Sequence, residues 1–248
     1  MSDPLDLLAG YRLVDLSPAI HTNMPNWPGH PGVGVIDDAR NYAQNGYYAQ
    51  TLVLSEHSAS HVDAPSHSHE AMLDATIDGY PPEKFAGPAR RLDLSGYGLG
   101  PGECAGVAQL LEQLEAQGQR LAPGDFVLLR FGCSPYEHPY EEREHWERNA
   151  PGLDEEACRF LAEANVAGVG SDTLACDIAV RDGEIVSAFG HLNYFLPNHI
   201  LIYEGLINLA EVTPDSFFLA LPLRVRNGSG APFRGLAACP PAARGAGR

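Results

Sequence analysis

Residues 56–70, EHSASHVDAPSHSHE, hold four of the ten histidines of the chain. His57, His61 and Asp63 lie four and two residues apart, and the residues between them are small or apolar. Side chains alternate between the two faces of an extended strand. If residues 57–63 are extended, both imidazoles and the carboxylate project from one face.

His67 follows four residues after Asp63, and Pro65 lies between them. Proline does not continue a central strand, so we expect the chain to turn at Pro65 and His67 to lean back over the same face. Converging imidazoles and a carboxylate are costly unless something satisfies them. Zinc, manganese or iron would do so. The alternative is a histidine-rich surface loop that binds nothing, and His69 lies outside the spacing.

Two further polar residues interrupt apolar stretches in the second half of the chain. His191 lies in AFGHLNYFL, and Glu204 lies in ILIYEGLI. A buried carboxylate needs a partner, which predicts that Glu204 binds a metal or forms a salt bridge with an arginine. His191 is a candidate ligand or a hydrogen-bonded core histidine. Asp172 is expected either to orient a ligand imidazole or to cap a turn.

Composition narrows the class of protein. The 248 residues are 44% hydrophobic and 19% charged, enough for one large domain with a core or for two small ones. A net charge of −16 disfavours nucleic acid and membrane surfaces as partners, which leaves a small-molecule substrate. The five scattered cysteines form no CxxC pair, so neither a disulfide framework nor a thiolate zinc site is expected. No membrane-spanning run or signal peptide is recognisable, and we expect a cytoplasmic protein.

Periodicity predicts more strands than helices, with both types alternating in the middle of the chain. We therefore expect one α/β domain with a mixed β-sheet core, flanking helices and a disordered tail over 239–248. The predicted strands are 12–20, 47–63, 125–131, 166–172, 199–209 and 217–225, the predicted helices are 106–119 and 153–166, and 21–34 is an irregular loop.

The motif HSASHVDAPSH resembles the HxGTHxDxPxH signature of the metal-dependent cyclase-like hydrolases, a family that includes bacterial kynurenine formamidase and isatin hydrolase. Ala59 replaces the glycine of the signature and Ser60 replaces the threonine. The resemblance implies a single domain over 1–238 of the swivelling β/β/α type. Further similar segments are DLSPAIHTNMPNWPG (15–29), AGVGSDTLACD (167–177), GHLNYFLPNHILIYEGLINL (190–209) and LPLRVRNGSGAPFRGLA (221–237).

The resemblance also implies the ligands of a metal centre. His57 and His191 would bind one metal, His61 would bind the other, Asp63 would bridge them, and Glu204 would be shared. In isatin-type members a glutamine replaces Glu204 and a single manganese is bound. The glutamate here favours two divalent ions per chain, zinc or manganese, as in the formamidases.

Such a centre suits hydrolysis of an amide, in an aryl formamide such as N-formylkynurenine or in a cyclic amide such as isatin. By resemblance His67 is the catalytic acid/base, and its ordinary pKa of about 6.5 suits proton transfer. A cyclase, dehydratase or lactonase of secondary metabolism, or a non-catalytic binding protein, stays an alternative. Residues 134–152 would form a lid or a subunit contact, and the resemblance favours a homodimer or homotetramer. The predicted substrate-binding aromatics are Trp27, Phe131 and Tyr194, with Tyr47, Tyr48 and Phe195 as further candidates.

Overall fold

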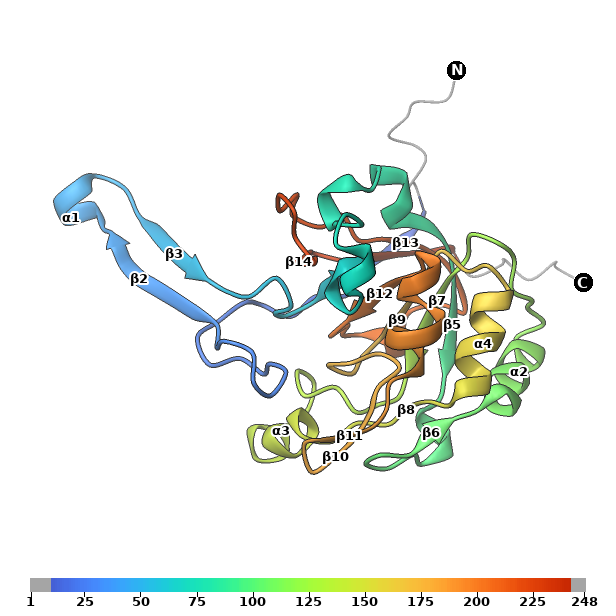
Figure 1. Cartoon of the computed structure of the whole chain (residues 1–248). Coiled ribbons are helices and arrows are strands. Elements are labelled where there is room, and N and C mark those ends of the chain that lie inside the picture. The colour runs from blue at the N-terminus through green and yellow to red at the C-terminus, as the bar shows by residue number, and fades with distance from the viewer. Residues whose placement is uncertain (1–9, 242–248) are drawn as a thin grey trace, which may run out of the picture.

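The computed structural model describes residues 10–241 and is built around a nine-stranded sheet in the order β1-β15-β13-β5-β7-β9-β12-β4-β14 (Figure 1). Strands β5, β7, β9 and β12 run parallel, and the strands on both sides of them pair antiparallel. The sheet is therefore mixed, as predicted. Its strands are β1 (Arg12–Asp15), β4 (His61–Asp63), β5 (Ala86–Asp93), β7 (Phe126–Arg130), β9 (Gly168–Ser171), β12 (Leu201–Glu204), β13 (Asp215–Leu219), β14 (Gly230–Pro232) and β15 (Leu236–Cys239).

Three two-stranded sheets accompany the large one. They are β2 (Gly34–Arg40) with β3 (Ala49–Val53), β6 (Cys104–Ala105) with β8 (Gly152–Leu153), and β10 (Ala179–Arg181) with β11 (Glu184–Ser187). The α-helices are α1 (Tyr42–Asn45), α2 (Val107–Ala116), α3 (Tyr140–Glu147) and α4 (Glu155–Glu163).

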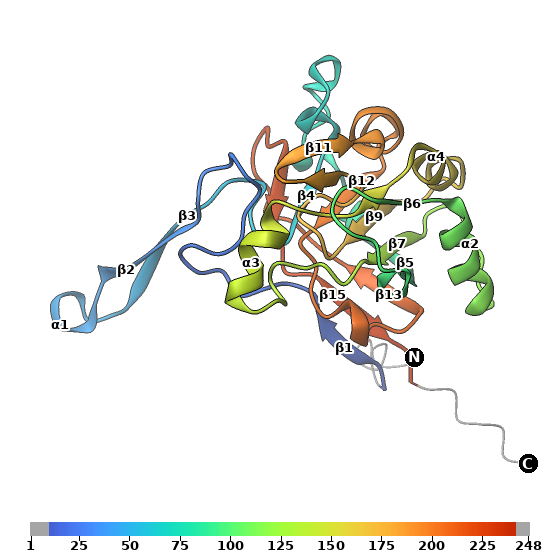
Figure 2. The same cartoon turned by 90° about the horizontal axis from the view of Figure 1, so that it is seen from below.

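The strand β7 shows how one sheet serves two cores. Phe126 and Leu128 point to one face and pack with Tyr203. Val127 and Leu129 point to the other face, toward the side covered by α2 and α4 (Figure 2). A strand buried on both faces is a continuous apolar run, which is why periodicity identified residues 125–131 correctly.

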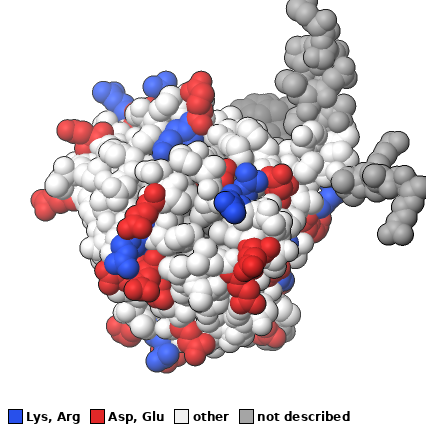
Figure 3. All heavy atoms as spheres, turned by 90° about the vertical axis from the view of Figure 1, so that its right-hand side faces the viewer, with Lys and Arg blue, Asp and Glu red and all other residues white. Residues whose placement is uncertain are grey.

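Both predicted helices are present, each slightly shorter than expected. Asp154 is the N-cap of α4, and its side chain accepts a hydrogen bond from the backbone N–H of Ala157. Among the described residues, no helix is long and apolar enough to cross a membrane. Acidic and basic side chains are interspersed on the face carrying α2 and α4, where the described residues form no continuous basic patch (Figure 3).

Several predicted strands are shorter than expected, and one predicted strand is interrupted by a turn. The strand predicted over 47–63 is two strands, β3 and β4, that belong to different sheets. Residues 57–60 between them form a turn, because Ala59 has φ 57°. The predicted disordered tail also begins too early. Cys239 is the last residue of β15 and pairs with Arg12, while residues 242–248 of that tail lie outside the described residues.

Candidate metal centre

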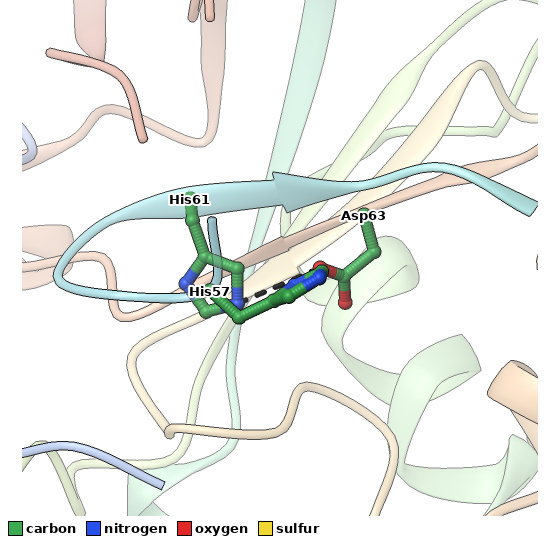
Figure 4. Close-up of side chains that lie close together, drawn as sticks. All are labelled: His57, His61 and Asp63. Atoms are coloured by element: carbon green, nitrogen blue, oxygen red, sulfur yellow. Dashed lines mark hydrogen bonds and ion pairs between the residues drawn. The ribbon is translucent and has the colours of Figure 1, made fainter. Parts of the chain in front are cut away.

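The centre is built on β4, where the predicted alternation of side chains is present. His61 and Asp63 lie two residues apart and project to the same side of the strand (Figure 4). Strand β4 pairs antiparallel with β12, and Glu204 is the register partner of His61. The sheet thus brings residues from both halves of the chain together, and all three are at most 5% exposed.

His57 reaches the same place through a turn. Ala59 has φ 57°, in the left-handed region that glycine adopts most readily. The carbonyl oxygen of Ala59 lies 3.0 Å from His61 Nδ1, and His57 Nδ1 lies 2.6 Å from Asp63 Oδ1 (Figure 4). The expected extended conformation is therefore wrong for residues 57–60, although the three side chains still converge.

His191 comes from a short π-helix, Gly190–Tyr194, a conformation found frequently at functional sites. Its Nδ1 lies 2.5 Å from Asp177 Oδ1. The other carboxylate oxygen of Asp177 accepts hydrogen bonds from the backbone N–H groups of Gly190 and His191, at 2.7 and 3.1 Å. Because Asp177 accepts a hydrogen bond from Nδ1–H, Nε2 is the nitrogen of His191 that faces Asp63 and Glu204.

The ring of His57 is held from its opposite side. Ser229 donates its hydroxyl to Glu56 Oε2 at 2.8 Å, and its Oγ lies 2.8 Å from His57 Nε2. The serine oxygen can therefore accept a hydrogen bond from Nε2–H, and Nδ1 is the ring nitrogen that faces Asp63. Histidine ligands of metals commonly have such a hydrogen-bond partner on the second ring nitrogen.

The spacing of the inner atoms fits shared cations. His61 Nε2 lies 3.5 Å from Asp63 Oδ1 and 3.3 Å from Glu204 Oε2. His191 Nε2 lies 3.4 Å from Asp63 Oδ2 and 3.5 Å from Glu204 Oε1. Two donors bound tetrahedrally to one cation at about 2.1 Å are about 3.4 Å apart. Each carboxylate therefore presents one oxygen to His61 and the other to His191.

Asp63 gives a second test of this fit. Its Oδ2 is buried, and no hydrogen-bond partner for it lies among the described residues. Its carboxylate is shared by two groups of potential ligands, His57–His61–Asp63 and Asp63–His67–His191. The residues present therefore fit divalent cations, but the structure groups His57 with His61, whereas the resemblance pairs it with His191.

The electrostatics of the centre favour positive charge. Burial alone lowers the pKa of His61, but the carboxylates of Asp63 and Glu204 outweigh it and raise that pKa to about 9. Burial raises the pKa of Glu204, and the adjacent Asp63 raises it further. Protons and divalent cations therefore compete for the same cluster.

His67 belongs to the second group of potential ligands, Asp63–His67–His191, and lies at the end of a 3-10 turn that Pro65 begins. Its ring centroid lies 3.9 Å from that of His57 and 6.1 Å from that of His191. Burial lowers the pKa of His67 to about 4, against the opposing charge of Asp63. His67 is therefore a neutral imidazole at pH 7, which can accept a proton.

A cavity of about 240 Å³ opens over the centre. His57, His61, His67, His191 and Glu204 form its polar end. Its walls are largely apolar, and no lysine or arginine is among the described residues that line it. The other lining residues are Asn26, Trp27, His30, Ser68, Tyr136, Leu174, Ala175, Ile178, Ile185, Ala188 and Leu192.

The comparison that decides the family is a match of residues 14–178 to the sequence model of the Cyclase family, described as "Putative cyclase". The chain belongs to this cyclase family. It is 28% identical to a kynurenine formamidase from Salinibacter ruber, over 90% of this chain and 95% of that protein. It is 25% identical to an isatin hydrolase from Roseibium aggregatum, over 77% and 74% of the two chains.

Solved structures of isatin hydrolases share the fold of this chain. Isatin hydrolase A from Ralstonia solanacearum superposes with a TM-score of 0.82 at 26% identity, covering 96% of this chain and 98% of that one. An isatin hydrolase bound to the product analogue thioisatinate also superposes with a TM-score of 0.82, at 22% identity over 95% of each chain. The second similarity concerns the fold alone.

Of the aromatic residues predicted to bind substrate, only some lie at the cavity of the described structure. Trp27 lines the cavity. Phe131 lies in the core under α2 and α4, and Tyr194 donates a hydrogen bond to Glu155 on the outer surface, so neither lines the cavity. Of the further candidates, Phe195 is a core residue, and Tyr47 and Tyr48 are exposed on the projecting hairpin.

The cyclase centre also contains residues to which the sequence assigned no role. Asp177 orients His191, and Ser229 with Glu56 orients His57. Tyr136 lines the cavity. Tyr136 brings the 134–152 segment to the cavity, and its hydroxyl donates a hydrogen bond to the carbonyl oxygen of Pro25. The carboxylate of Asp172 accepts hydrogen bonds from the backbone N–H groups of Phe131 and Gly132, which follow β7, so it ties two distant segments together. Asp177 could have been identified as a candidate, because it ends the segment AGVGSDTLACD (167–177) that resembles the family.

Proposed function

We propose that this protein is a metal-dependent hydrolase that cleaves the carbon–nitrogen bond of an amide, in an aryl formamide or a cyclic amide. The observation that carries the proposal is the equal spacing of His61 and His191 from the oxygens of Asp63 and Glu204. The named activities of the formamidase and isatin hydrolase relatives support it.

The proposed ligands are His57, His61, Asp63, His191 and Glu204, which would hold two divalent cations, zinc or manganese. Bound cations would lower the pKa of water and polarise the substrate carbonyl. The protein's own residues then supply orientation and proton transfer. As water adds to the carbonyl carbon, neutral His67 accepts a proton from it, and His67 returns that proton to the leaving nitrogen as the carbon–nitrogen bond breaks.

The walls of the cavity favour an uncharged aromatic substrate. Trp27 offers a flat surface for an aryl ring, and Leu174 and Ile178 add apolar contacts. A substrate carboxylate would find no lysine or arginine among the described lining residues. We therefore infer that the protein prefers a neutral cyclic amide or a neutral aryl formamide over an amino-acid substrate such as N-formylkynurenine. The inferred location is the cytoplasm.

Hydrolysis of isatin, formanilide and N-formylkynurenine tests the proposal. The protein is assayed as purified, after chelation, and after addition of zinc or manganese. We expect chelation to abolish turnover, re-addition to restore it, and the two neutral substrates to give the higher kcat/KM. Turnover that is indifferent to chelation would contradict the metal-dependent mechanism.

Substitution of His67 separates an enzyme from a binding protein. His67→Gln should lower kcat by roughly 10²–10⁴-fold, the usual contribution of a general acid/base, and leave the cation content unchanged. His21→Gln is the control, because the exposed ring of His21 contacts the backbone oxygen of Thr22 and lies outside the cavity lining. Equal activity of both variants would remove His67 from the proposed mechanism.

A further inference from the structure

The apolar wall of the cavity over the metal centre comes mainly from one segment, residues 174–192. Leu174 and Ile178 line the cavity and are buried. Ile185 on β11 and Leu192 on the π-helix line the same cavity, but they are 57% and 53% exposed. The apolar wall therefore continues from the buried interior of the cavity to the outer surface of the protein.

We call Ile185 and Leu192 the cavity rim. Single exposed apolar side chains are common on protein surfaces and usually need no explanation. These two differ from such residues because both lie where the cavity meets the solvent. Leu192 also directly follows the ligand candidate His191, whose side chain lines the same cavity. A group that extends out of the cavity would therefore meet apolar surface before it reaches water.

The volume of the cavity limits what its interior can hold. Sites that enclose drug-sized ligands have volumes of roughly 300–1,000 Å³. The cavity here has about 240 Å³, and part of it borders the metal centre. An aryl amide without further groups suits this interior, whereas any large substituent on it must leave through the mouth. The rim residues lie on that path.

We propose, on the basis of the proposed hydrolysis, that the cavity rim binds an apolar substituent on the aryl ring of the substrate. An aryl formamide carries only hydrogen on its acyl carbon, so an added group belongs to the aryl side. In a cyclic amide such as isatin the fused ring offers the same position. The substrate class is therefore a neutral aryl amide that carries a short alkyl or similarly apolar group.

Contact with the rim should change binding rather than the chemical step. The substituent lies away from the bond that breaks, so the rim contacts it equally in the ground state and in the transition state. Such uniform binding lowers KM and leaves kcat nearly constant. Complete burial of one methylene group improves affinity about fourfold, and half burial on an exposed rim improves it about twofold.

A series of alkyl formanilides tests the proposal with the cation-loaded protein. The para or meta substituent is hydrogen, methyl, ethyl, propyl or butyl. For the wild type we expect kcat/KM to rise about twofold to fourfold per methylene in at least one series. The increase should come from KM, with kcat changing by less than about twofold across the alkyl members.

Two rim variants and one matched control locate the effect. Ile185→Ser and Leu192→Ser should each reduce the gain per methylene toward onefold. Val186→Ser is the control, because Val186 neighbours Ile185 on β11 and is 53% exposed, but is not among the described residues that line the cavity. The comparison uses the gain per methylene, so a general loss of activity in a variant does not affect it. Ile185 lies on a two-stranded hairpin away from the large sheet, so its variant remains informative if Leu192→Ser disturbs His191.

Binding of the corresponding alkylanilines separates this proposal from the proposed hydrolysis. Calorimetry should show Kd falling by the same factor per methylene, and the rim variants should flatten that trend. If the alkylanilines bind in this way but no formanilide is cleaved, the hydrolysis is wrong and the rim proposal stands. If formanilides are cleaved at a kcat/KM that is indifferent to chain length, the rim proposal is wrong and the hydrolysis stands. Equal gains per methylene in the rim variants and in Val186→Ser would also overturn the rim proposal.

Discussion

The hydrogen-bond partners of the three buried imidazoles determine what those side chains can bind. The Asp177 carboxylate is the hydrogen-bond partner of His191 Nδ1, and the Ala59 carbonyl is that of His61 Nδ1. The Ser229 hydroxyl is the partner of His57 Nε2. Each remaining nitrogen faces a carboxylate, where it can carry a proton or bind a cation. Such an arrangement is stable only with positive charge at the centre, either protons or cations.

The role of Asp177 can be separated from that of a generic buried acid. Asp177→Asn should weaken cation binding by about 10–100-fold, because the amide is a poorer acceptor for the His191 Nδ1 proton. Competition with a fluorescent chelator measures the affinity. Asp172→Asn is the matched control, since Asp172 is equally buried but bonds only backbone groups. Similar losses in both variants would indicate a general effect of buried charge.

Cation binding should release protons in a pH-dependent way. The pKa of His61 is raised to about 9, so its ring is protonated at pH 8 in the cation-free protein and must lose that proton to bind. We expect at least about one proton released per centre filled at pH 8, and the contribution of His61 to that release should vanish above about pH 10. Calorimetry in buffers of different ionisation enthalpy counts these protons. Uptake at pH 8 without proton release would contradict the raised pKa.

At the scale of elements, alternation along a strand correctly predicted the placement of His61 and Asp63, whereas His57 is positioned by the turn over residues 57–60. His61 and Asp63 share a face because both lie in β4, as expected. His57 converges with them because Ala59 adopts a left-handed conformation. The sequence did not predict this conformation, because alanine rather than glycine occupies the position. The pairing of Glu204 with His61 was also inaccessible to local patterns, because strand order is a long-range property.

Substitutions of Ala59 test the importance of that turn. Relief of left-handed strain by Ala59→Gly is worth about 1–2 kcal/mol, but losing a buried methyl costs about 0.8 kcal/mol and added unfolded-state freedom costs about 0.4–1 kcal/mol. These effects nearly cancel, so the free energy of unfolding should change by less than about 1 kcal/mol.

The β-branched variant Ala59→Val should behave differently from the glycine variant. Valine tolerates the positive φ poorly and overfills a site that is 4% exposed, so we expect a loss of at least about 2 kcal/mol. Urea denaturation of the three proteins measures both changes. If valine is tolerated as well as glycine, the turn does not constrain residue 59 as the structure indicates.

At the scale of the whole molecule, the centre joins strands that are distant in sequence. Asp63 and His61 come from β4, Glu204 comes from β12, and His191 precedes β12 on its π-helix. The unfolded chain cannot present these donors together. Cation binding should therefore stabilise the folded state as a whole.

Thermal unfolding measures this stabilisation. A cation at about 100 times its Kd adds about 2.7 kcal/mol, which for a chain of this size raises Tm by roughly 5–10 °C. Chelation should lower Tm by the same amount, and re-addition should restore it. Asp63→Asn should unfold at one temperature with or without the cation, because Asp63 links both groups of potential ligands. If the cation raises Tm equally in that variant, it binds elsewhere on the protein, and His57, His61 and His191 are then a hydrogen-bonded cluster neutralised by protons.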